Sequence, residues 1–211
     1  MSGSFVSPET RSRVRGLMTP IAVGLGRLGL TPNALTLIGF GIACIAAVLA
    51  GMQLWLAAGL LVVFGGVFDL FDGALARATN TVSKLGAFMD SVFDRWGEGV
   101  VYVGIVWGAV AAGWTDGAIL AAAAMTSAFM VSYTRAKAES LGFTPGTGMA
   151  NIGLAPREIR IVILTVGLVL AGLSSITALG IALGLIAVLA TITTIQRIVV
   201  TINQARTSEQ G

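Results

Sequence analysis

The sequence predicts an all-α integral membrane protein with six transmembrane helices, preceded by an amphipathic helix that lies on the membrane surface. Of the 211 residues, 55% are hydrophobic and only 11% are charged, with a mean hydropathy of +0.89. The charged residues are also separated by uncharged runs long enough to cross a bilayer. Because a soluble domain carries about 25% charged residues, this composition excludes an ordinary soluble protein, and it excludes disorder as well.

We expect three regions along the chain. These are a cytoplasmic and interfacial segment (residues 1–30), a six-helix transmembrane catalytic domain (residues 31–203) and a short cytoplasmic tail (residues 204–211). Arginines are interspersed with apolar residues from Pro8 to Leu30, a pattern typical of an amphipathic helix on the inner leaflet. A cleaved signal peptide is the alternative interpretation, but Arg27 interrupts the apolar stretch before it continues into a full-length span.

The first three spans follow from the positions of charges and glycines. No charged residue lies between Arg27 and Asp69, a run about twice the ~20 residues that cross a bilayer as one helix. Gly51 divides this run into spans one and two. The third span extends from Leu85 to about Ala112 and has a polar first half.

The last three spans and the orientation follow in the same way. After a turn at residues 113–117, span four reaches Arg135, and residues 172–175 divide the uncharged run between Arg160 and Arg197 into spans five and six. The loops after spans one, three and five contain no Lys or Arg. The positive-inside rule therefore places the other loops and both termini on the cytoplasmic side of the cell membrane.

Four aspartates mark the candidate active site. Asp69 and Asp72 are three residues apart and Asp90 and Asp94 are four apart, so each pair projects from one face of its helix. We expect the two pairs to face each other across a helix hairpin. An acidic residue near the bilayer centre costs roughly 2.5 to 3.5 kcal/mol, so four of them together need compensating positive charge.

Divalent metal ions are the expected compensation. The chain has no histidine and a single cysteine, Cys44, which excludes a thiolate or imidazole metal site. Two ions would match four carboxylate charges, and hard oxygen ligands favour Mg²⁺ or Mn²⁺. Alternatively, the aspartates are interfacial residues paired with Arg77, Lys84 and Arg95. Small residues in register with the acids favour the metal site, because they let a bulky substrate approach.

These residues form a recognisable motif. Asp69-x-x-Asp72-Gly73-x-x-Ala76-Arg77, followed after eight residues by Gly86-x-x-x-Asp90-x-x-x-Asp94, resembles in full the signature of the CDP-alcohol phosphotransferase family. The resemblance implies that family's membrane-embedded fold, its homodimeric assembly and its reaction. In that reaction a substituted phosphate moves from a CDP-linked donor to an alcohol, and CMP is released.

The resemblance also implies roles for individual residues. Asp69, Asp72, Asp90 and Asp94 would hold two metal ions around the donor pyrophosphate, and Asp94 would also deprotonate the acceptor hydroxyl. The residues expected to bind the donor are Gly73, Ala76, Arg77 and Ser83, together with the segment Thr31, Pro32 and Asn33. For that segment a purely structural role is equally open, with Thr31 as the cap and Pro32 in the first turn of a helix. The depth of the site in the membrane favours CDP-diacylglycerol as the donor.

A second cationic cluster suggests a phosphorylated acceptor. Its members lie at the cytoplasmic ends of spans four, five and six: Ser132, Arg135, Lys137, Arg157, Arg160 and Arg197. Arginine and lysine suit phosphate, although anchoring to anionic lipid is the alternative role for each of them. Arg197 has apolar neighbours and Gln196 beside it, so we expect it to point inward.

The identity of the acceptor stays open between related enzymes. The stretch from Ser132 to Glu139 and the sequence Ala155-Pro156-Arg157-Glu158 resemble the actinobacterial phosphatidylinositol-phosphate synthase branch, whose acceptor is inositol phosphate. A phosphatidylglycerolphosphate synthase, which uses glycerol 3-phosphate, would need a similar basic cluster. A phosphatidylserine synthase fits less well, because serine carries no phosphate.

A cation transporter is the alternative from a different class of protein, since carboxylates within membrane helices also line ion paths. The acids of this chain cluster toward the cytoplasmic half, whereas the outer portions of the spans are almost free of polar residues. The pattern therefore favours an enzyme with one cytoplasmic site over a path through the membrane.

Overall fold

The computed structural model is all-helical and describes residues 8–143, 148–149 and 152–208. Its helices in chain order are α1 (Pro8–Arg27), α2 (Pro32–Gly51), α3 (Trp55–Ala78), α4 (Lys84–Ala111), α5 (Thr115–Ser140), α6 (Arg157–Leu173) and α7 (Ile176–Ser208). Helices α2 to α7 correspond to the six expected spans. Helix α7 continues through residues 204–208, so the part of the expected tail that the structure describes is helical.

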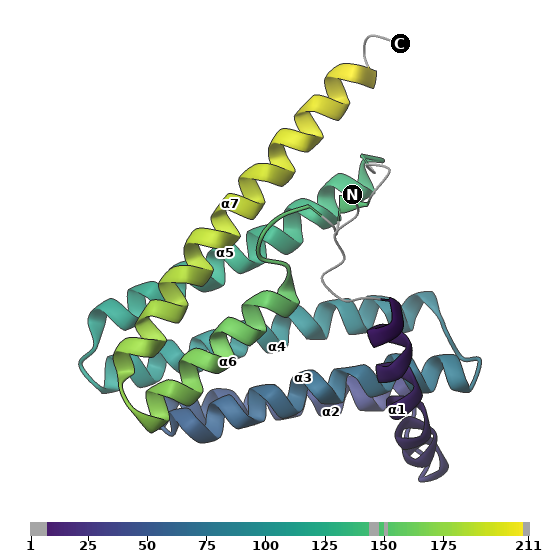
Figure 1. The fold of residues 1–211 in the computed structure, drawn as a ribbon, viewed down its shortest axis with the longest axis horizontal. Helices are drawn as coiled ribbons and strands as arrows, with labels where there is room; N and C mark the ends of the chain where they lie inside the picture. The colour runs from purple at the N-terminus through teal and green to yellow at the C-terminus, as the bar shows by residue number, and fades with distance from the viewer. Residues whose placement is uncertain (1–7, 144–147, 150–151, 209–211) are drawn as a thin grey trace.

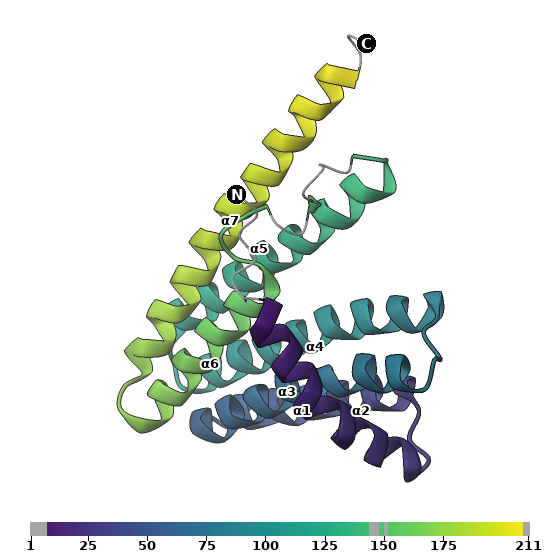
Figure 2. The same ribbon diagram turned by 45° about the vertical axis from the view of Figure 1, so that its right-hand side comes forward.

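The helices α2 to α7 form a closed ring. Helix α3 packs on α2 and α6, α4 packs on α2 and α5, and α7 packs on α5 and α6. In Figures 1 and 2, α2, α3 and α4 run side by side, while α5 and α7 extend away from them at an angle. Because of this angle, the end of α3 and the start of α4 lie apart from the C-terminal ends of α5 and α7.

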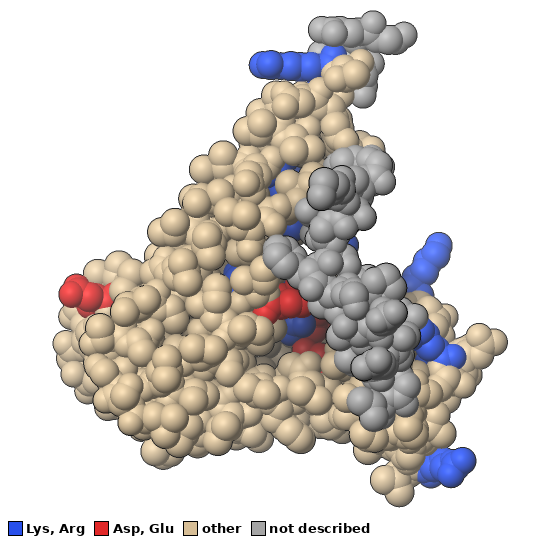
Figure 3. Space-filling model, viewed as in Figure 1, with Lys and Arg blue, Asp and Glu red and all other residues tan. Residues whose placement is uncertain are grey.

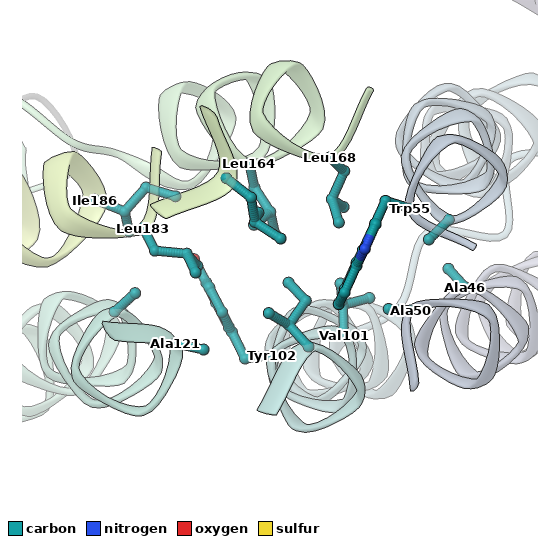
Figure 4. Packing of buried hydrophobic residues seen from close by; sticks show 14 of the residues in the cluster. Ala46, Ala50, Trp55, Val101, Tyr102, Ala121, Leu164, Leu168, Leu183 and Ile186 are labelled. Carbon is teal, nitrogen blue, oxygen red and sulfur yellow. The ribbon is translucent and has the colours of Figure 1, made fainter. Parts of the chain in front are cut away.

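Apolar side chains fill the middle of the ring (Figure 4). Tyr102 and Ile105 of α4 and Leu168 of α6 are fully buried there, and Trp55 of α3 lies among them. Burial of a large apolar side chain contributes roughly 1.5–3 kcal/mol. The core therefore holds the ring together at the end away from the four aspartates.

Helix α1 lies outside the ring against α3 (Figures 1 and 2). Its Ala22 is fully buried and packs with Leu35 of α2 and Ala74 and Leu75 of α3. The expected helix is therefore present. Its predicted location on the membrane surface depends partly on the arginines at 11, 13 and 15. Their side chains lie outside the described part of the structure.

Four helices are long and apolar enough to cross a membrane, namely Pro32–Gly51, Trp55–Ala78, Thr115–Ser140 and Ile176–Thr207. Large hydrophobic side chains such as Ile45, Phe64 and Val188 are exposed on them, as expected for surfaces that face lipid. Helix α4 carries four charged residues between Asp90 and Glu98, and α6 has only 17 residues. Whether these two also span the membrane stays a prediction.

Close packing between α2 and α4 depends on glycine. A Cβ atom at Gly104 would collide with the carbonyl oxygen of Ala47, and one at Gly108 with that of Ala50. Neither carbonyl can move without disturbing α2. The α2–α4 contact, which places the α4 aspartates beside α2, therefore requires these glycines.

We predict that Gly104→Ala lowers the stability of the detergent-solubilised protein by about 1–3 kcal/mol, because the added methyl group overpacks the α2–α4 contact. Gly41→Ala on α2 is the matched control, since its Cβ would have no neighbour within 4 Å and alanine favours the helix by about 1 kcal/mol. Thermal unfolding measures both. Equal melting temperatures for the two variants would contradict the packing argument.

Candidate active site

The four aspartates lie on α3 and α4 where these helices approach α2 and α6. Asp72 is the most enclosed, at 7% exposure. Its Oδ2 accepts a hydrogen bond of 2.7 Å from the Thr36 hydroxyl of α2, and its Oδ1 accepts one from the Gly73 amide. Both bonds fix the carboxylate before any ligand binds.

Arg157, the first residue of α6, lies between two of the carboxylates. Its Nη2 donates to Asp69 Oδ2 at 3.0 Å, and its Nη1 lies 2.9 Å from Asp94 Oδ2. Arg95 donates to the same Asp94 oxygen at 3.2 Å. The Nε atom of Arg157 is buried and has no hydrogen-bond partner in the described structure. The guanidinium thus neutralises Asp69 and Asp94 while keeping one donor free.

The donor set fits a divalent metal ion, but the present arrangement favours Arg157. Carboxylate oxygens are the ligands that Mg²⁺ and Mn²⁺ prefer. Gly39 of α2 leaves room beside them, since a Cβ there would lie 2.8 Å from Asp69 Oδ1. Within the described residues, however, no three acidic, histidine or cysteine side chains are grouped closely enough to hold an ion. Binding of an ion therefore requires the guanidinium to leave the space between Asp69 and Asp94.

Two large cavities adjoin the acids, in addition to a small one of about 50 Å³ whose wall includes Asp69, Asp94 and Arg157. The first, here called the α2–α3–α4 cavity, has a volume of about 480 Å³. Its wall includes Asp72 and Asp90 and all seven residues expected to bind the donor: Thr31, Pro32, Asn33, Gly73, Ala76, Arg77 and Ser83. The residues predicted to bind the donor come from two separate parts of the sequence, residues 31–33 and residues 73–83. The structure brings both parts to the wall of one cavity.

Some residues of this wall also have structural roles. The Thr31 hydroxyl accepts a hydrogen bond of 3.2 Å from the Ala34 amide and caps α2, and Ser83 caps α4 through the Gly86 amide at 3.0 Å. A Cβ at Gly86 would lie 3.2 Å from the Ser83 hydroxyl. The structural role considered for Thr31 is therefore present, while its position on the cavity keeps a role in binding available.

The second cavity, here called the α3–α4–α6 cavity, has a volume of about 460 Å³. Most of the rest of its wall consists of valines and isoleucines of α3 and α6, and its polar part is formed by Asp69, Asp90, Asp94, Arg157, Glu158 and Thr165. Figure 3 shows acidic and basic side chains meeting in a hollow in the middle of one face, with uncharged residues to the left of them. Because Asp90 lines both cavities, ligands in the two would meet at the acids.

The structure divides the other predicted acceptor residues into several environments. Arg197 is only 3% exposed and donates to the carbonyl oxygens of Ile152, at 3.0 Å, and Val131. The Ser132 hydroxyl donates to a carbonyl of its own helix, Arg135 pairs with Glu139 at 3.0 Å, and Lys137 is exposed. Of the predicted acceptor residues, only Arg157 lines either of the two cavities.

Arg160 was expected to belong to the cationic cluster that binds the acceptor phosphate, but the structure places it elsewhere. It is 1% exposed and bonded to Glu98, so it does not face an acceptor. Thr36, which binds Asp72, was not anticipated as a site residue. Its position one helical turn after Pro32, on the face of a predicted binding segment, is the signal that could have identified it.

The chain belongs to the CDP-alcohol phosphatidyltransferase family, which matches residues 29–202. The resemblance based on the aspartate motif is therefore confirmed. The chain is thus a transferase of this class.

Its relatives include enzymes that make inositol lipids. It is 37% identical to an archaetidylinositol phosphate synthase of Pyrococcus horikoshii, over 90% of this chain and 93% of that one. It is 33% identical to a phosphatidylinositol phosphate synthase of Mycobacteroides abscessus, over 82% and 75% of the two chains. The resemblance to the actinobacterial branch is confirmed by such matches.

Solved structures agree with the sequence relatives. A crystal structure of Mycobacterium tuberculosis phosphatidylinositol phosphate synthase with CDP-DAG bound superposes with a TM-score of 0.78 at 32% identity, covering 87% of this chain and 92% of that one. Another structure of the same enzyme, in complex with manganese and citrate, also has a TM-score of 0.78. The described helices therefore adopt the fold of this family.

We predict that Thr36→Val slows transfer roughly tenfold or more, because a hydrogen bond to a charged group contributes about 1.5–3 kcal/mol and the variant removes one from Asp72. Thr194→Val is the matched control: it is equally buried at 8% exposure, and its hydroxyl bonds only a carbonyl of its own helix. Initial rates of CMP release measure both. Equal rates in the two variants would show that the Thr36 hydroxyl is dispensable.

Proposed function

We propose that this protein transfers the phosphatidyl group of CDP-diacylglycerol to a hydroxyl of a phosphorylated polyol, with inositol phosphate as the favoured acceptor. The bond between the acceptor oxygen and the donor's β-phosphorus forms, the bond from that phosphorus to CMP breaks, and the hydroxyl proton leaves to a carboxylate. The observation that carries this proposal is the meeting of the two cavities at Asp90. One cavity presents the predicted nucleotide-binding residues and the other presents Arg157 beside Asp94.

The relatives support the choice of acceptor. The names of the Pyrococcus and actinobacterial enzymes share inositol phosphate and differ in the lipid part. A phosphorylated acceptor also explains why an arginine lines the cavity that contains Asp94, since guanidinium groups bind phosphate through paired hydrogen bonds. Glycerol 3-phosphate shares this chemistry and is the alternative acceptor.

The proposed metal site consists of Asp69, Asp72, Asp90 and Asp94, with Mg²⁺ as the physiological ion and Mn²⁺ as an acceptable substitute. Two bound ions would neutralise charge that develops on the transferred phosphoryl oxygens and on the departing CMP. The M. tuberculosis enzyme crystallised with manganese supports the use of a divalent ion.

The chain's own residues would bind and orient the two substrates, and one of them would take up the hydroxyl proton. The α2–α3–α4 cavity, with Gly73, Arg77 and Ser83 on its wall, holds the nucleotide. Asp94 accepts the hydroxyl proton at Oδ2, the atom that Arg157 and Arg95 now contact. Positioning and electrostatic stabilisation provide most of the acceleration in such phosphoryl transfers.

Arg157 is proposed as the principal ligand of the acceptor phosphate. Its free Nε donor and its place on the α3–α4–α6 cavity support this role. Ser132, Arg135, Lys137 and Arg197 remain proposed as a further acceptor-binding group in the C-terminal halves of α5 and α7. Of these, Arg197 also binds the backbone of the segment that leads into α6.

We further propose that all six helices of the ring span the cell membrane, that the site and both termini face the cytoplasm, and that two chains form a homodimer. The distribution of Lys and Arg supports the orientation, and the family resemblance supports the dimer.

Release of CMP by the purified full-length protein tests the function directly. Inositol phosphate, free inositol, glycerol 3-phosphate and serine are compared as acceptors with Mg²⁺ and CDP-diacylglycerol, and a CDP-linked archaetidyl lipid serves as a second donor. We expect the highest rate with inositol phosphate. Preference for glycerol 3-phosphate would establish the alternative acceptor, whereas ion flux in proteoliposomes without CMP release would establish a transporter.

We predict that Asp69→Asn, Asp72→Asn or Asp90→Asn abolishes transfer and weakens Mn²⁺ binding, because each variant removes one of four ligand charges. Electron paramagnetic resonance of bound Mn²⁺ measures the second effect independently of activity. Asp94→Asn is expected to be inactive while binding of CDP-diacylglycerol is largely retained, since its proposed additional role is proton transfer. Near-normal turnover in any variant would remove that residue from the site.

We predict that Arg157→Ala raises KM for inositol phosphate with a loss of roughly 2 to 5 kcal/mol of transition-state stabilisation, while KM for the donor changes little. Mn²⁺ binding should be retained, because the variant removes a cation that competes for Asp69 and Asp94. Arg157→Lys should rescue only part of the loss, since an ammonium cannot make paired contacts. A raised donor KM with an unchanged acceptor KM would instead assign Arg157 to the donor.

A further inference from the structure

An ion pair lies buried beneath the site and takes no part in the proposed chemistry. Arg160 of α6 donates to both carboxylate oxygens of Glu98 of α4, from Nε at 2.8 Å and from Nη2 at 2.7 Å. The two side chains are 1% and 4% exposed. Such a planar, two-bonded pair fixes both the distance and the relative rotation of the two helices.

The pair continues into a chain of hydrogen bonds that reaches α7. Arg160 Nη1 donates to the Ala155 carbonyl at 3.0 Å. The amides of Ala155 and Leu154 both donate to the hydroxyl of Thr193 on α7, at 3.0 and 2.9 Å. We call Glu98, Arg160, Thr193 and the backbone of residues 154–155 the buried belt. It joins α4, the start of α6 and α7 through polar groups alone.

A glycine allows the belt to close. Gly153 has a φ of 117° and a Cβ there would collide with the Thr193 side chain. A larger residue would therefore push the segment off α7. Only because residue 153 lacks a side chain can the two amides that follow it reach the Thr193 hydroxyl.

The belt is in register with the site. Glu98 lies one turn after Asp94, Arg160 one turn after Arg157, and Thr193 one turn before Arg197. Residues three or four apart share a helix face. Fixing the belt residues therefore fixes the rotation and depth of the residues one turn away, on all three helices.

Stability alone does not account for this pair. Replacing a buried ion pair by apolar residues of similar volume is often neutral or stabilising, and charged residues within a membrane bundle are costly. We propose that the Glu98–Arg160 pair and Thr193 are positioning residues that hold the start of α6, and with it Arg157, beside the α3–α4–α6 cavity and so set recognition of the phosphorylated acceptor. This inference rests on the proposed function for the roles of Arg157 and Asp94.

The double variant Glu98→Leu/Arg160→Met tests this proposal, because it removes the pair without leaving a buried charge alone. We expect the melting temperature in detergent to be unchanged or raised. KM for inositol phosphate should rise roughly 10- to 100-fold, the scale of a misplacement of about 1 Å at a reacting centre. KM for CDP-diacylglycerol should stay within about twofold. Calorimetric binding of inositol phosphate without donor should weaken in parallel.

Two single substitutions at Thr193 test the proposal independently, in case the double variant does not fold. Thr193→Val removes the hydroxyl that accepts from Ala155 and Leu154, whereas Thr193→Ser keeps it. We expect the valine variant to raise acceptor KM and the serine variant to restore it. Thr194→Val, whose hydroxyl bonds only its own helix, should behave as the wild type.

The outcomes separate this inference from the proposed function. Absence of CMP release by the wild-type protein would reject the function itself. With an active wild type, a folded variant whose acceptor KM and acceptor affinity match the wild type would overturn the positioning role. So would a loss shared equally between donor and acceptor, because that is the result of a merely structural role.

Discussion

The contact of the Arg157 guanidinium with Asp69 and Asp94 is the interaction around which the rest of the structure is arranged. Carboxylates grouped within a membrane protein repel one another and need a positive partner. The guanidinium supplies it from α6, a helix far from the aspartates in sequence. The contact joins the start of α6 to α3 and α4.

The ring of helices has an apolar end and a polar end. Apolar side chains around Tyr102 hold one end of the ring together, and Gly104 lets α2 and α4 approach closely. Helices α5 and α7 diverge from α2, α3 and α4 toward the other end (Figures 1 and 2), and the two cavities lie among α2, α3, α4 and α6. Polar contacts of Glu98 and Arg160 lie between the apolar core and the acids, where the geometry of the site is set.

The sequence predicts well what depends on one helix. Charges and glycines locate the helix ends, and the spacing of the aspartates places Asp69 with Asp72, and Asp90 with Asp94, about one helical turn apart. The inward position of Arg197 also follows from its apolar neighbours, and it is buried in the structure. Each of these properties is determined by residues within a few turns of one another.

Contacts between helices could not be predicted in the same way. Spacing fixes how a side chain is rotated on its own helix, but not which helix faces it. Arg160 and Arg157 both look like phosphate ligands in the sequence, yet one is paired with Glu98 and the other with Asp69. Only the packing of α6 against α3 and beside α4 distinguishes them.

The location of Mn²⁺ in crystals of this protein, determined by anomalous scattering, tests the central claim most directly. The account predicts anomalous density among Asp69, Asp72, Asp90 and Asp94, with the Arg157 guanidinium displaced from Asp69 and Asp94 toward the α3–α4–α6 cavity. Density elsewhere, or Arg157 still paired with both carboxylates in crystals saturated with Mn²⁺, would contradict it.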